Sequence, residues 1–188
     1  RSHTMRGMSP VGACHAFVVL GLLSALACAP APPPQSVPER FDAFVDAFLG
    51  HFAERHPSIA AGNGIHRYDD RLEDLSATAV AAEIEAWKGL RARLDAIPVA
   101  ALTADERVDH RIAGGLIDAW LFDLETNRNW QKNLMIYAAA ISDGVHNLMT
   151  MESSPAEVRA ARIIGKLRAV PMLLAAARAN VTAPPRVM

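Results

Sequence analysis

The chain has 188 residues, enough for one domain with a sizeable hydrophobic core. Its net charge is -1 and its Lys and Arg residues are scattered, which argues against nucleic acid as a partner, because such binding depends on concentrated positive charge. Both cysteines, Cys14 and Cys28, precede the expected folded region, so we expect neither a disulfide framework nor a thiolate metal site in the body.

A secretory signal is predicted at the N-terminus. Residues 1–4 read as flanking residues, and from Met5 a basic Arg6 precedes an apolar run over residues 16–26. That run is shorter than the ~20 residues that a bilayer span needs. We therefore predict a signal peptide over residues 5–27 and an exported protein, either periplasmic or a membrane-anchored lipoprotein.

Cys28 directly follows the small-residue end of the apolar run. A lipid on this cysteine would anchor the mature chain to a membrane surface, although Ala25 stands where a lipobox usually has Leu. Plain cleavage after Ala27 and an uncleaved anchor are the alternatives, and all three export the protein. Residues 28–37 are rich in Pro and predict an extended linker.

Residues 38–188 are predicted to be all-α, a bundle of about five helices with short connections. Apolar residues recur at intervals of three and four, and no alternating strand pattern occurs. Capping boxes mark three helix starts, and Ser76 is a further candidate cap. Pro57 and Pro98 should end the first two helices, and Pro171 should kink or split the last one. The three boxes are Ser36–Glu39, Thr103–Glu106 and Ser154–Glu157.

Gly114 and Gly115 fall inside the third predicted helix. Each glycine costs about 1 kcal/mol relative to alanine in a helix interior. Close approach of another helix would offset that cost, and a kink is the alternative.

The helical body shows no catalytic motif. His51 and His56 are five residues apart, about 140° around a helix, so they do not share a face as zinc ligands would. Glu83 and Glu85 are interpreted as part of a solvated face. No His-Glu-x-x-His, Gly-x-Ser-x-Gly or phosphate-binding glycine loop occurs in the sequence.

Residues 56–72 form the longest stretch of the body that reads as neither helix nor simple linker. They are rich in Gly, His, Tyr, Asp and Arg. Composition alone favours a structured connection whose charges pair in solvent, since loops are polar for many reasons. A binding or catalytic role is the alternative.

The same stretch carries a family resemblance. Residues 57–72, followed by Asp74-Leu75-Ser76, resemble the N-terminal signature of the DUF885 family, bacterial proteins that are often exported. Residues 102–109, and residues 130–134 with Tyr137, resemble the next family segments in the same order. The resemblance covers roughly residues 38–188.

This resemblance implies a large, mainly helical protein similar to zinc metallopeptidases, hydrolases of the His-Glu-x-x-His type. In the family that motif lies far downstream, so we expect no catalytic residue, metal ligand or cofactor in this chain. Zinc is implied for the full-length protein only, and the chain is expected to be an inactive, truncated N-terminal lobe. Such a lobe should expose an apolar face.

The expected partners are the missing C-terminal half of the same protein, a peptide substrate and a membrane reached through lipid on Cys28. The resemblance also predicts that five residues of the signature face a cleft completed outside this chain. The alternative function is a non-enzymatic, membrane-tethered helical binding lipoprotein, and a third is a partial gene product with no function. The five predicted cleft residues are His66, Tyr68, Asp69, Asp70 and Arg71.

Overall fold

The computed structural model describes residues 36–182, in which every regular element is helical. The all-α prediction is therefore confirmed for this part of the chain; the predicted signal peptide and Cys28 lie outside it. Within it, no helix combines the length and the apolar run needed to cross a bilayer. Five long helices form the scaffold: α2 (Val37–Arg55), α4 (Ala77–Asp95), α5 (Ala104–Leu121), α7 (Met135–Thr150) and α8 (Ala156–Asn180).

Four short elements connect these helices. They are α3 (Pro57–Gly62), a 3-10 turn (Val99–Ala101), a π-helical turn (Phe122–Asn127) and α6 (Asn129–Lys132). The helix α3 corrects the expectation that residues 56–72 hold no helix. Its physical basis is proline at the first helical position, followed by small residues that can be buried.

Two of the predicted capping boxes are confirmed. The Ser36 hydroxyl accepts from the backbone N–H of Glu39, whose carboxylate accepts from the Ser36 N–H in return, and Thr103 and Glu106 make the same reciprocal pair. Ser76 caps α4 by accepting from the N–H of Ala79. Each cap satisfies backbone donors that the first helical turn leaves without partners.

The third capping box, at Ser154, is wrong. The helix α8 has Pro155 as its N-cap and no side-chain cap, because the Ser154 hydroxyl instead accepts from Arg162 Nη1 at 3.2 Å. Of the kink or split predicted at Pro171, the split is wrong, since α8 continues through this residue as one helix. Pro171 is exposed, while Leu173 and Ala177 keep the following turns packed.

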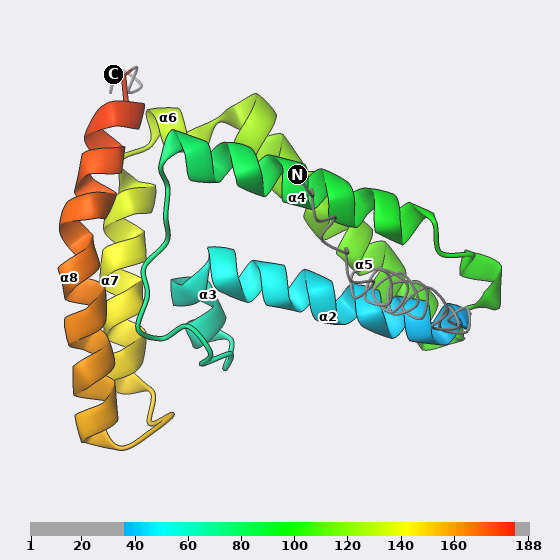
Figure 1. The fold of residues 1–188 in the computed structure, drawn as a ribbon, viewed down its shortest axis with the longest axis horizontal. Coiled ribbons are helices and arrows are strands. Elements are labelled where there is room, and N and C mark those ends of the chain that lie inside the picture. The colour runs from blue at the N-terminus through cyan, green and yellow to red at the C-terminus, as the bar shows by residue number, and fades with distance from the viewer. Residues whose placement is uncertain (1–35, 183–188) are drawn as a thin grey trace, which may run out of the picture. The chain divides into compact units, whose positions relative to one another are not determined.

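The helices α2, α4 and α5 form the larger packed group. In Figure 1 each of these helices runs antiparallel to the one before it in the sequence, and α4 contacts both of the others. The aromatic stripe of α2 is buried in the core of this group, as its helical spacing predicted. The core consists of Phe41, Phe44, Phe48, Val80, Trp87, Leu90, Leu94, Ile97, Leu102, Ala113, Ile117 and Leu124.

The helices α7 and α8 form a second group. They lie side by side as an antiparallel hairpin (Figure 1). Their core is smaller and contains Leu72, Tyr137, Leu173 and Ala177. The short helix α3 packs on both α2 and α7, so it joins the two groups.

Close packing explains one glycine of the Gly114-Gly115 pair but not the other. A Cβ at Gly114 would lie 3.4 Å from Arg91 Nη1 and 3.6 Å from Leu94 Cδ2, both on α4. A Cβ at Gly115 would meet nothing within 4 Å. Gly144 on α7 is tighter still, because its Cβ would lie 2.5 Å from Ser58 Oγ on α3.

Alanine substitutions at these helical glycines should have opposite effects. We predict that Gly144→Ala lowers the free energy of unfolding by about 1–3 kcal/mol, because it overpacks the α3–α7 contact. Gly115→Ala is the matched control and should raise it by up to about 1 kcal/mol. Urea unfolding of both variants measures the difference, and a change of the same sign and size in both would contradict the packing described.

Candidate functional site

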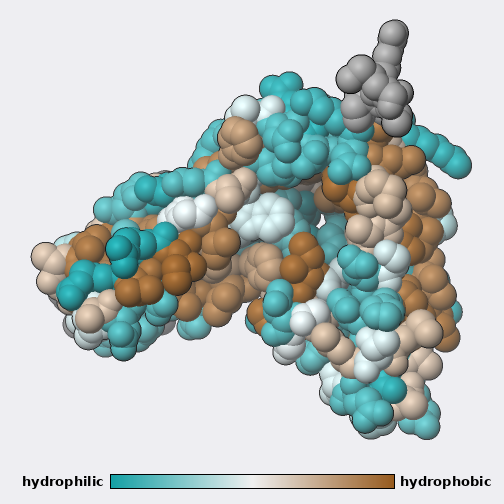
Figure 2. Space-filling model, turned by 180° about the vertical axis from the view of Figure 1, so that it is seen from behind, coloured by the Kyte–Doolittle hydropathy of each residue, from teal (hydrophilic) through white to brown (hydrophobic). Residues whose placement is uncertain are grey.

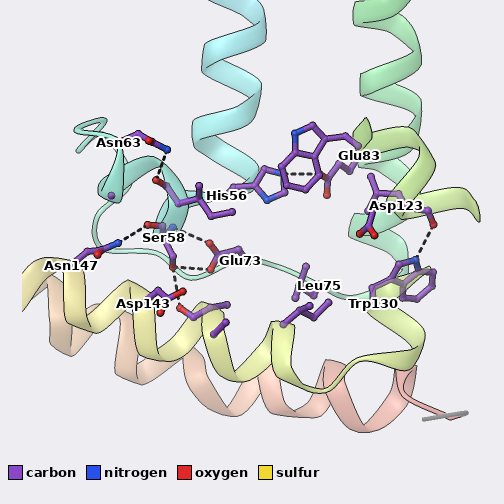
Figure 3. Close-up of a pocket in the computed structure, with 17 residues that line it drawn as sticks. His56, Ser58, Asn63, Glu73, Leu75, Glu83, Asp123, Trp130, Asp143 and Asn147 are labelled. Atoms are coloured by element: carbon purple, nitrogen blue, oxygen red, sulfur yellow. Dashed lines mark hydrogen bonds and ion pairs between the residues drawn. The ribbon is translucent and has the colours of Figure 1, made fainter. Parts of the chain in front are cut away.

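A cavity of about 540 Å³ lies where the two helical groups meet α3. Figure 3 shows Ser58, Glu73 and Asp143 on one side of it and Asp123 and Trp130 on the other. Its lining also includes the indole of Trp120 and the side chains of Leu75, Leu124 and Ile136. The polar residues that line the cavity are His56, Ser58, Asn63, Glu73, Glu83, Asp123, Asp143 and Asn147.

Glu83 on α4 corrects the sequence interpretation most strongly. It was expected on a solvated face with Glu85, but only 1% of the residue is exposed. Glu83 lies three residues after Val80 and four before Trp87, both buried, so it belongs to the inward stripe of the helix. That spacing was the available signal, and Glu85, two residues later and about 200° further round the helix, is exposed.

The Glu83 carboxylate is surrounded by donors. Its Oε2 accepts from Arg55 Nε at 3.1 Å and Nη2 at 2.9 Å, and its Oε1 accepts from Trp87 Nε1 at 3.2 Å. His56 Nε2 also lies 2.9 Å from Oε1. Burial alone would raise the pKa of Glu83, but His56 and Arg55 outweigh burial and lower it to about 2.

His51 on α2 and His56 at the C-terminal cap of this helix contact different indoles. His56 stacks on Trp120 at a ring separation of 4.1 Å, and His51 meets the Trp87 ring edge-on at 4.5 Å. Burial lowers the pKa of His51, so this ring is neutral near pH 7. The two rings therefore complete an aromatic cluster.

Ser58 and Glu73 fasten α3 to the segment that leads into α4. The backbone N–H and the hydroxyl of Ser58 each donate to the Glu73 carboxylate at 2.9 Å. Asn147 Nδ2 on α7 donates to the Ser58 carbonyl at 3.0 Å. Glu73 is 5% exposed, so its charge is stabilised mainly by these bonds and by nearby Lys166.

Asp123 is presented by the π-helical turn that follows α5. Its Oδ1 accepts from Asn127 Nδ2 at 2.8 Å and from Asn129 Nδ2 at 2.7 Å. Arg128, between the two asparagines, has a positive φ of 52°, an uncommon conformation for a non-glycine residue. Asp123 was not among the site residues predicted from the sequence.

The five residues predicted to face a cleft do not line this cavity. Asp69 is 1% exposed and pairs with His66 Nδ1 at 3.1 Å and with Arg162 Nη1 on α8 at 3.0 Å. The Arg71 guanidinium lies 4.9 Å from the centre of the Tyr68 ring. Asp70 and Arg71 are exposed. That these residues face a cleft completed outside the chain stays a prediction.

The described part of the chain offers no metal centre. Within residues 36–182, no three His, Cys, Asp or Glu side chains gather at ligand spacing. The residues present therefore do not fit the zinc that the family resemblance implies. What they provide is a cavity with oriented carboxylates and indole walls.

We predict that Glu83→Gln destabilises the protein by about 3 kcal/mol at pH 7, because Arg55 loses a buried partner. The folded-state pKa of Glu83 is depressed, so this stability is present above pH 4.5 and is lost as the pH falls towards 2. Urea unfolding at pH 7 and pH 3 should show the penalty shrinking in acid. The matched control is Glu85→Gln; an equal loss there, or a penalty independent of pH, would contradict the assignment.

Comparisons with known proteins place the chain in a family. No curated protein matches it. A solved structure described as "a putative lipoprotein of unknown function" from Shewanella oneidensis shares the fold, with a TM-score of 0.70 and 21% sequence identity. The match covers 80% of this chain but 27% of that one, so the chain spans about a quarter of the relative's length.

The family model described as "Bacterial protein of unknown function (DUF885)" matches residues 57–187, a range that begins at α3. The match includes the 56–72 stretch from Pro57 onward and extends over more than half of the sequence. The chain therefore belongs to the DUF885 family.

Proposed function

We propose that this chain is the N-terminal helical lobe of an exported zinc-dependent peptidase and that it shapes one side of the substrate cleft. The proposal rests on the resemblance to zinc metallopeptidases that the sequence implies for the DUF885 family, on membership of that family, and on the greater length of the structural relative. In it, the catalytic half follows this lobe in the full-length protein. The lobe by itself is inactive.

Exposed apolar stripes are the main observation in support of the proposal that this chain is a lobe of a larger protein. On α5, Val108, Ile112 and Leu116 are spaced by four residues and remain 43%, 55% and 45% exposed. They share one face of the helix, because residues four apart lie one above the other. A contiguous exposed apolar stripe of this kind marks a surface that another protein segment covers.

The outer side of α8 carries a second stripe. Ile164, Leu167 and Leu174 are 49%, 51% and 40% exposed, although α8 packs its other side on α7. Figure 2 shows apolar surface gathered along the α7–α8 group and also on the α2–α4–α5 group. In the proposal, the remainder of the same polypeptide covers both stripes.

The zinc ion of this proposal belongs to the part of the protein beyond this lobe. Residues 36–182 contain no group that fits it. Zinc would supply an activated water for peptide hydrolysis. The contribution of this chain is to bind and orient the peptide, through the cavity and through the predicted cleft residues around His66.

Export forms part of the proposal. Residues 5–27 supply the signal pattern, and Cys28 is the candidate for lipid attachment. The structural relative is itself described as a putative lipoprotein, which agrees with this assignment. The protein would then work in the periplasm or on a membrane surface.

A non-enzymatic binding lipoprotein is the second candidate function. The cavity of about 540 Å³ favours it, because that volume is typical of sites for small ligands. In this version the lobe and its remainder would capture a ligand without hydrolysing it. Peptide turnover separates the two candidates.

The full-length protein should hydrolyse peptides in a zinc-dependent manner. We expect turnover of a mixed peptide library to stop on chelation and to return when zinc is added, because zinc generates the attacking water. This chain alone, assayed with and without zinc, is the matched control and should remain inactive. No turnover by the metal-loaded full-length protein would contradict the peptidase proposal and favour the binding lipoprotein.

A further inference from the structure

Carboxylates predominate among the charged groups that line the cavity, with His56 as the titratable base beside them. Glu73, Glu83, Asp123 and Asp143 all line it, and no Lys or Arg does. The chain as a whole is nearly neutral, with a net charge of -1, so this imbalance is local. A concave site lined by one sign of charge attracts a ligand of the opposite sign.

Two of these carboxylates are already committed to the fold. Glu83 is paired with Arg55, and Glu73 accepts both Ser58 donors. Neither is free to bind a ligand without leaving a buried group unsatisfied.

The other two carboxylates remain available. Within residues 36–182, neither Asp123 nor Asp143 forms an ion pair with Lys, Arg or His. Asp123 is held in place by two amide donors on one oxygen, and Asp143 is an exposed residue at the rim on α7. Together they provide negative charge that the fold itself does not neutralise.

Aromatic walls accompany these carboxylates. Trp120 and Trp130 both line the cavity, and each is held in position by a neighbour. Trp120 is stacked on His56, while Trp130 Nε1 donates to the Leu124 carbonyl at 3.1 Å. The faces of indole rings attract organic cations and also pack against apolar stems.

We propose that the cavity binds a primary ammonium group carried on an extended apolar stem, with the carboxylates of Asp123 and Asp143, on opposite sides of the cavity, attracting the charge and Trp120 and Trp130 packing against the stem. The carrier that fits is the lysine side chain of a peptide. Naming a peptide as the carrier rests on the proposed function, whereas ammonium binding itself does not.

The test titrates the full chain with hexylammonium and with hexanol, its neutral counterpart of equal length. Tryptophan fluorescence reports binding, because two of the three tryptophans line the cavity. We expect hexylammonium to bind at least ten-fold more tightly than hexanol. Equal affinities, or no binding of hexylammonium, would overturn the proposal.

Single substitutions then locate the charge. Asp123→Asn and Asp143→Asn should each weaken hexylammonium binding at least three-fold, with circular dichroism confirming the fold. Asp143 is exposed and makes no ion pair in the described residues, so D143N tests the role of the carboxylates even if D123N unfolds. Asp109→Asn, an exposed carboxylate about three helical turns from Trp120, is the matched control. An equal effect of D109N would overturn the proposal.

A last comparison tests the carrier. A blocked pentapeptide with one lysine should bind at least ten-fold more tightly than the same peptide with Nε-acetyl-lysine. Equal binding of the two peptides overturns the peptide assignment. These titrations need no turnover, so a failure of hydrolysis in the full-length protein and a failure of ammonium binding are separate results.

Discussion

A buried carboxylate requires partners, and the junction of this fold is built around one. Glu83 lies inside the α2–α4–α5 group, and Arg55 and His56, at the end of α2, both approach it. Pro57, which follows at once, ends α2 and begins α3 beside these contacts. The contacts also position His56 against Trp120, which becomes a wall of the cavity. Charge pairing in the core thus sets the geometry of the site.

A second set of polar contacts fastens the connection before α4 to α8. Asp69 pairs with Arg162, Lys166 Nζ donates to the Arg71 carbonyl at 2.6 Å, and Asn180 Nδ2 donates to the Leu75 carbonyl at 2.6 Å. The bonds from Lys166 and Asn180 satisfy backbone carbonyls of a segment that has no strand partner in the described residues. The segment therefore acts as the seam between the two helical groups, and the cavity opens beside it.

Local sequence signals predicted the scaffold well, and long-range pairing explains the failures. The caps at Ser36 and Thr103 were predictable because both partners lie within one turn. The same reasoning failed at Ser154, whose hydroxyl is taken by Arg162, eight residues away. Glu83 was misplaced although its spacing to Val80 and Trp87 marks the inward stripe, since its partner Arg55 is 28 residues distant and was not visible locally. The cavity depends on such distant contacts, so only its individual residues were visible in the sequence.

The central claim is that this chain is a lobe whose apolar stripes are covered by the rest of the protein. Thiol labelling tests it most directly, in a background in which the two native cysteines are replaced. Ile112→Cys and Leu167→Cys would be introduced into this chain and into the full-length protein, with Glu85→Cys as the exposed control. We predict labelling at least ten-fold slower at the first two positions in the full-length protein and unchanged at the control. Equal labelling rates in both proteins at Ile112→Cys and Leu167→Cys would contradict the account.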